Sequence, residues 1–324
     1  LWGRRHNGQW VYVKMQCVPG VLPAGRSGLG PAPQSEEDKR RCQMNMMKSA
    51  SGKEPSMERH KQMVELAVRK LQRACGLEGL GVDAWVENVV SPYPGYHMEQ
   101  AHIKQPALIM QPARGVSMKT LFAGRFDSVL NLTLLVAKIN SEDIRNIAIH
   151  DLLFSEGDRH DANVFVDETG KLTLIDNDQA LGWSYRETQE RLSSIFVKNT
   201  DRYNGLVDGE NLQWLDYRCH TGTADGTIGR KYPPKVEACM NDFAGSDPEE
   251  LQLRFRMPIL KQAEQLKQRA TDMLEKGYEE ALWRAQNIHV NKVPLGKAWY
   301  RNTTAAKHCA LPPSWDKFAA RQAN

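Results

Sequence analysis

The chain has 324 residues, of which 43 are basic and 39 acidic, and its formal net charge of +4 is too small to indicate a nucleic-acid partner. Hydrophobic residues make up 41% of the sequence, as in ordinary globular proteins, and the length suits one domain of two lobes or two small domains. Apolar runs are too short for an integral membrane span, which needs about 18 or more consecutive apolar residues.

Six cysteines are spread along the chain without the C-x-x-C spacing of a zinc ribbon or a redox motif. They fit two environments, a reducing cytoplasm and a secretory-pathway lumen with up to three disulfides, and the sequence leaves the compartment open. The chain begins with Leu1 instead of Met, so we expect an incomplete N-terminus. The cysteines are Cys17, Cys42, Cys75, Cys219, Cys239 and Cys309.

The first part of the chain predicts a small β-rich unit with one helix. An Asn7-Gly8 turn between alternating apolar runs indicates a hairpin. A segment rich in Pro, Gly and Ser then predicts a flexible insertion, and apolar residues at helical spacing, closed by Gly76, predict a helix. In chain order we expect a hairpin, the insertion, the helix and two short strands over 1–18, 18–56, 57–77, 83–90 and 107–110.

The second part predicts mainly helices. Ser141 and the acids after it resemble a helix start, and Asp247-Pro248 forms another, with a capping acid and proline in the first turn. In chain order we expect helices over 128–138 and 141–154, a hairpin over 163–175, an irregular segment over 177–246 and a broken helical stretch over 247–289.

The segment from Gly157 to Asp176, GDRHDANVFVDETGKLTLID, is the most informative for function. It places Asp158, Asn163 and Asp176 in the pattern D-x4-N-x12-D, with a strand, a turn and a strand between the last two. Protein kinases space a catalytic Asp and a metal-binding Asn in the same way, before a metal-binding Asp. Phosphoryl transfer needs one carboxylate to orient the acceptor hydroxyl, and an amide oxygen with a second carboxylate to hold Mg²⁺. The alternative is a surface hairpin with ordinary turn acids.

This motif resembles the catalytic loop and metal-binding strand of the phosphatidylinositol 3-/4-kinase-like superfamily, whose pattern is GDRHxxNI…GxLxxIDFG. The residues Ile175-Asp176-Asn177-Asp178 differ from IDFG and are nearer the LDNG or LDNE of secretory-pathway kinases such as Golgi casein kinase and four-jointed-like kinases. The resemblance implies an α+β, bilobal protein-kinase-like fold. Its small β-rich N-lobe, incomplete here, would cover 1–115, and its larger, mainly helical C-lobe 116–324, with the catalytic loop at 157–163 and the metal-binding segment at 175–178.

The resemblance assigns roles within the second lobe. Asp158 is expected to receive or orient the acceptor proton, and His160 to share that role or contact the γ-phosphate. Arg159 is expected to pair with an acidic group or a phosphate. A structural salt bridge for Arg159, a scaffold role for His160 and a solvent-exposed position for Asp178 are the alternatives. The expected ligands of Mg²⁺, or alternatively Mn²⁺, are Asn163, Asp176 and Asp178.

In the first lobe, the resemblance assigns ATP-binding roles to four residues. Lys14, in a Val-Tyr-Val-Lys strand, would contact the α- and β-phosphates, and Glu65 would pair with it. Met110 or Gln111, before a Pro/Gly linker, would contact the adenine through the backbone. The alternatives are a solvent-facing strand lysine and an exposed helix acid.

Together these features predict a kinase, an Mg-ATP-dependent phosphotransferase acting on a hydroxyl of a phosphoinositide, a protein or a sugar. The alternative is a catalytically weak pseudokinase that serves as a binding or activating module. Asn-Asp in place of Phe-Gly and the lack of a Gly-rich loop favour the alternative. The three retained Asp and Asn positions favour the enzyme.

Overall fold

A computed structural model of the chain describes residues 2–5, 8–15, 57–93, 101–122, 138–182, 192–197, 215–289 and 309. The chain divides into two compact units: unit 1 comprises Leu1–Leu66 and Asp83–Pro112, and unit 2 comprises Ala67–Val82 and Ala113–Asn324. Residues 67–82, expected in the first lobe, therefore belong to unit 2. The expected insertion over 18–56 lies outside the described residues.

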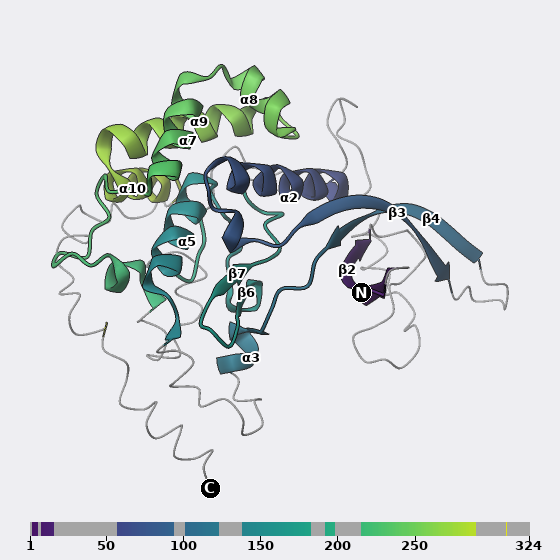
Figure 1. Cartoon of the computed structure of the whole chain (residues 1–324). Helices are drawn as coiled ribbons and strands as arrows, with labels where there is room; N and C mark the ends of the chain where they lie inside the picture. Colours follow the sequence, from purple (N-terminus) through teal and green to yellow (C-terminus); the bar gives the residue numbers. More distant parts are fainter. Residues whose placement is uncertain are drawn as a thin grey trace, which may run out of the picture. The chain divides into compact units, whose positions relative to one another are not determined.

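Unit 1 contains a four-stranded antiparallel sheet with the strand order β1-β2-β4-β3 (Figure 1). The predicted hairpin is confirmed: Gly8 closes its turn with φ +84°, and its N–H donates to the Arg5 carbonyl (2.9 Å). Val11 packs with Ala107 and Ile109 in a buried cluster on one face of the sheet. The strands are β1 (Trp2–Arg4), β2 (Trp10–Met15), β3 (Ala84–Tyr93) and β4 (Ala101–Met110).

Helices are the main elements of the described part of unit 2, and α9 packs against α5, α7, α8 and α10 (Figure 1). The predicted cap at Asp247 is confirmed, since its side chain accepts hydrogen bonds from the N–H groups of Glu249 and Glu250. The helices are α2 (Met57–Ala74), which begins in unit 1, and α3 (Met118–Phe122), α5 (Ser141–Leu153), α7 (Pro234–Gly245), α8 (Pro248–Phe255), α9 (Leu260–Lys276) and α10 (Tyr278–His289). None of the described helices is long and apolar enough to cross a membrane.

The expectation of an irregular segment over 177–246 is wrong at its end, where α7 forms. Pro233-Pro234 resembles a turn signal, but proline is well suited to the first turn of a helix because its missing N–H would have no partner there. Val236, Met240 and Phe243 are buried at helical spacing. That periodicity was present in the sequence and outweighs the prolines.

A second antiparallel sheet, with the order β5-β6-β7, also lies in unit 2. The turn between its last two strands contains Gly170 with φ +85°, where a Cβ atom would lie 2.1 Å from the Lys138 carbonyl oxygen. Only glycine fits this close approach of two backbones. The strands are β5 (Val116–Ser117), β6 (Val164–Val166) and β7 (Leu172–Leu174).

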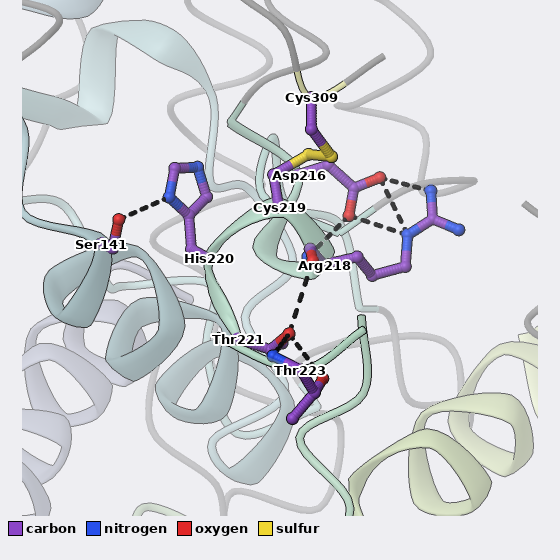
Figure 2. Close-up of a disulfide and its surroundings, with 8 residues drawn as sticks. All are labelled: Ser141, Asp216, Arg218, Cys219, His220, Thr221, Thr223 and Cys309. Atoms are coloured by element: carbon purple, nitrogen blue, oxygen red, sulfur yellow. Dashed lines mark hydrogen bonds and ion pairs between the residues drawn. A yellow bond between two sulfur atoms is a disulfide. The ribbon is translucent and has the colours of Figure 1, made fainter. Parts of the chain in front are cut away.

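Two disulfides connect distant parts of unit 2. Cys75, which follows α2, is bonded to Cys239 of α7 across a sequence separation of 164 residues. The second bond joins Cys219, in the 3-10 helix η4 (Tyr217–His220), to Cys309 (Figure 2). In the same figure Asp216 is ion-paired with Arg218, and the His220 ring is hydrogen-bonded to Ser141. Cys17 and Cys42 lie outside the described residues.

Candidate active site

The segment from Gly157 to Asn163 folds back on itself between α5 and β6. Its last residues form the 3-10 helix η2 (Asp161–Asn163), which His160 caps by accepting a hydrogen bond at Nδ1 from the Ala162 N–H (3.1 Å). The Asn163 side chain donates through Nδ2 to the Asp158 carbonyl (3.0 Å). Asp158 and Asn163 are therefore held close together in one compact turn.

The register of the β6-β7 hairpin brings Asp176 to the same end as Asn163. Val164 pairs with Leu174, and the Ile175 N–H donates to the Asn163 carbonyl (3.0 Å), one residue before Asp176. Asp176 has φ +57°, in the left-handed region that residues other than glycine seldom adopt, although aspartate does so more often than most. Such backbone positions concentrate at functional sites, where surrounding contacts hold them in place.

The Asp158 carboxylate is held by a residue that sequence reasoning missed. Gln179 donates from Nε2 to Asp158 Oδ2 (2.8 Å), and its carbonyl accepts from the Gly157 N–H (3.1 Å). The side chains of Asp158 and His160 are 15% and 29% exposed, and His160 Nε2 lies 3.9 Å from Asp158 Oδ2. Both side chains are thus partly accessible. The position of Gln179, three residues after Asp176, carried no signal by itself.

Arg159 is completely buried and is surrounded by hydrogen-bond acceptors. Its guanidinium donates to Asp151 Oδ1 (3.3 Å), Glu156 Oε2 (3.1 Å), Asn177 Oδ1 (2.6 Å) and the Ile175 carbonyl (3.0 Å). This is the structural salt bridge that the sequence left as an alternative. The guanidinium lies in the protein interior.

His150 supports this cluster from α5 as a neutral imidazole. The amide oxygen of Gln72 accepts a hydrogen bond from Arg69 (3.1 Å). The other amide atom of Gln72, the nitrogen Nε2, therefore lies 3.0 Å from His150 Nε2. Because an amide nitrogen can only donate, His150 Nε2 accepts and Nδ1 carries the proton, which it donates to Asp151 Oδ1 (2.9 Å). Burial lowers the pKa of His150, which favours this neutral form.

Asp151 remains ionised in the interior. Burial alone would raise the pKa of its carboxyl, but the Arg159 guanidinium and hydrogen bonds from His150 and Ser194 together hold the pKa below its usual value. The Ser194 hydroxyl donates to Asp151 Oδ2 (2.6 Å). The cluster therefore combines one buried cation with fixed anionic acceptors.

Asn177 and Asp178, which follow Asp176, are both buried, and the sequence alone did not settle whether these side chains face the interior or solvent. Asn177 occupies the position of Phe in the IDFG pattern, and its side-chain oxygen accepts from Arg159. Asp178 is only 3% exposed, so the alternative of a solvent-exposed acid is wrong for this residue.

The four expected ATP-binding residues lie in unit 1. Lys14 is half-buried in β2 opposite Leu108 of β4, on the face away from Val13. Glu65, in α2, is 2% exposed and is therefore no surface acid. Met110 ends β4 and is buried, and the following Gln111 donates its backbone N–H to the Asp83 carbonyl (2.9 Å). The N–H of Gln111 therefore already has a hydrogen-bond acceptor within unit 1.

The residues expected to hold a cation have suitable chemistry. In the described part of the chain, no three His, Cys, Asp or Glu side chains are arranged as a metal site. Mg²⁺, however, is commonly held by one or two carboxylates together with water and substrate phosphates. Since Asn163 uses its amide nitrogen on the Asp158 carbonyl, its amide oxygen is the atom left to face a cation. An amide oxygen next to an aspartate suits Mg²⁺ or Mn²⁺.

Comparison with known proteins gives no family assignment. No protein-family model matches the chain, and no curated protein sequence matches it significantly. Function is therefore inferred from the residues and their geometry.

Proposed function

We propose that the protein is a kinase with a bilobal, protein-kinase-like fold, which transfers the γ-phosphoryl group of Mg-ATP to a hydroxyl group. One observation carries this proposal. Asp158 and Asn163 are joined in one turn by the Asn163 side chain, and the Ile175 N–H joins that turn to the segment that begins with Asp176. Asp176 also has a left-handed backbone, and such backbone positions concentrate at functional sites.

Asp158 would act as the group that accepts or orients the acceptor proton. Gln179 holds one carboxylate oxygen, which fixes the orientation of the group, and the Asp158 side chain is 15% exposed. His160 uses Nδ1 within the turn, so Nε2 is the nitrogen that would share the proton or contact the γ-phosphate. Both side chains would thus act at the acceptor oxygen and the transferred group.

Asn163, Asp176 and Asp178 would hold Mg²⁺, or Mn²⁺, which when bound offsets the negative charge of the phosphates. We also propose that Lys14, Glu65, Met110 and Gln111 take part in binding ATP, as the family resemblance implies. For Gln111 the carbonyl would be the contact, because its N–H is engaged by Asp83.

The two disulfides indicate which kind of hydroxyl group would accept the phosphoryl group. Stable disulfides form in oxidising compartments and are rare in the cytosol. A hydroxyl of a secreted protein or of a sugar is therefore favoured over a phosphoinositide, whose headgroups face the cytoplasm.

The proposal is tested with the full chain, ATP and Mg²⁺. We expect ATP to raise the thermal unfolding midpoint only when Mg²⁺ or Mn²⁺ is present, and Asp176→Asn to abolish that shift. Asp158→Asn should keep the shift but lower ATP turnover, measured as ADP release, by about 100-fold or more. Asp225→Asn, which changes an exposed turn carboxylate, is the matched control and should behave as the wild type.

Two results would contradict the enzyme. Unchanged turnover in Asp158→Asn would remove that residue from its role. A metal-dependent shift with ATP but no turnover in the wild type would instead identify a pseudokinase, and the absence of any shift would overturn the nucleotide site itself.

A further inference from the structure

Glu156 connects the backbone of Asp158 to Arg159. It is fully buried and uses both carboxylate oxygens: Oε1 accepts from the Asp158 N–H (3.0 Å), and Oε2 accepts from Arg159 Nη2 (3.1 Å). The position of the Asp158 backbone is therefore coupled to the position of one guanidinium. The family pattern GDRHxxN begins after this residue and makes no statement about it.

The same guanidinium contacts the residues on both sides of Asp176. Arg159 Nη1 donates to the Ile175 carbonyl (3.0 Å), and Nη2 donates to Asn177 Oδ1 (2.6 Å). A planar guanidinium has a rigid arrangement of donors, so its bonds fix direction as well as distance. The segment that contains Asp176 is thereby held at two points.

The guanidinium is itself anchored to α5. Arg159 Nε donates to Asp151, whose carboxylate is fixed by His150 and by Ser194. Because a buried cation without acceptors is strongly unfavourable, the arginine is constrained to this one arrangement.

We propose that Glu156, Arg159 and Asn177 form a brace that sets the position of Asp158 relative to Asp176. This inference rests on the proposed phosphotransfer, in which Asp158 acts on the acceptor and Asp176 holds the metal. The three residues are positioning residues that do not touch the substrate. The brace also gives a reason for asparagine at position 177: its side-chain oxygen accepts a buried N–H, which the phenylalanine of the IDFG pattern could not do.

Accurate positioning matters because phosphoryl transfer depends on the alignment of acceptor, phosphate and metal. A displacement of about 1 Å in a catalytic group lowers rates by about 100-fold. Loosening the brace is thus expected to lower kcat while the overall fold is kept.

The first test is hydrogen exchange of the full chain without any ligand, and it does not depend on kinase activity. Asn177→Leu has nearly the same shape but no acceptor. We expect it to speed exchange about tenfold not only in 175–179 but also in 157–163, which the brace connects to it. Asn177→Asp restores an acceptor and should restore slow exchange in both segments. Asn241→Leu, at an exposed position of α7, is the matched control and should leave both unchanged.

The second test is steady-state kinetics with Mg-ATP. Asn177→Leu should lower kcat by about 100-fold with a smaller change in KM for ATP, and Asn177→Asp should recover most of the loss. If Asn177→Leu does not fold, Glu156→Gln, which keeps an acceptor for the Asp158 N–H but weakens the bond to Arg159, takes its place in both assays.

The outcomes separate the two proposals. If Asn177→Leu changes hydrogen exchange only in residues 175–179, the brace is overturned, whether or not the protein is a kinase. Exchange that changes in both segments, in a protein that never turns over ATP, would support the brace as a structural coupling but overturn the phosphotransfer on which its catalytic meaning rests.

Discussion

Acid is expected to destabilise the fold through His60. This side chain, in α2, is 2% exposed, and burial lowers its pKa from 6.5 to about 4. In the unfolded chain the imidazole titrates near its ordinary pKa of about 6.5. Below that pH the unfolded chain binds a proton that the folded chain does not, so stability falls as the pH drops from about 6.5 and stops falling below about 4. Between pH 7.5 and pH 5 this group alone should cost about 2 kcal/mol of unfolding free energy.

The assay is urea unfolding of the wild type and of His60→Gln at the two pH values. The wild type should lose about 2 kcal/mol more than the variant on acidification, whatever the variant does to stability at neutral pH. His150 also has a pKa lowered by burial, and it contributes equally to both proteins, so the difference isolates His60. An equal loss of stability in the two proteins would show that the imidazole is not buried as described, and the reasoning would fail.

Two further predictions concern stability. The double variant Cys75→Ser with Cys239→Ser should lower the unfolding free energy by up to about 5 kcal/mol, because the bond closes a loop of 164 residues in the unfolded chain, and an unfolding midpoint equal to that of the wild type would contradict this. Asp247→Ala should cost about 1 kcal/mol in urea unfolding, since the N–H groups of Glu249 and Glu250 lose their cap; Asp247→Asn keeps an acceptor and should cost much less.

Local features of the fold were predictable from the sequence. The turn closed by Gly8, the hairpin between Asn163 and Asp176 and the start of α8 at Asp247 each depend on residues near one another in the chain. Turn and capping chemistry act over a few residues, so a pattern is enough to find them. The assignment of residues 67–82 to unit 2 depends on long-range contacts such as the Cys75–Cys239 bond, and no local pattern contains that information.

In the candidate site, too, local sequence patterns were predictable and long-range contacts were not. The spacing of Asp158, Asn163 and Asp176 identified the segment, but the residues that fix their geometry were found only in the structure. Gln72 and His150 are 78 residues apart, and their hydrogen bond has no counterpart in any short motif. Glu156 and Gln179 were equally invisible, because a buried carboxylate and a half-buried amide are distinguished from surface residues only by their surroundings.

The backbone of Asp176 offers a way to weigh the two interpretations that the sequence left open. A left-handed conformation costs most residues about 1 kcal/mol or more; glycine adopts it without that cost, and aspartate is one of the few others that adopt it. Glycine would be the least costly residue at this position. Instead the chain has an aspartate there, and bonds from Arg159 to the neighbouring Ile175 and Asn177 hold the strained backbone in place. A carboxylate with this backbone, next to a buried network that holds its neighbours, supports the proposal that Asp176 is a metal ligand.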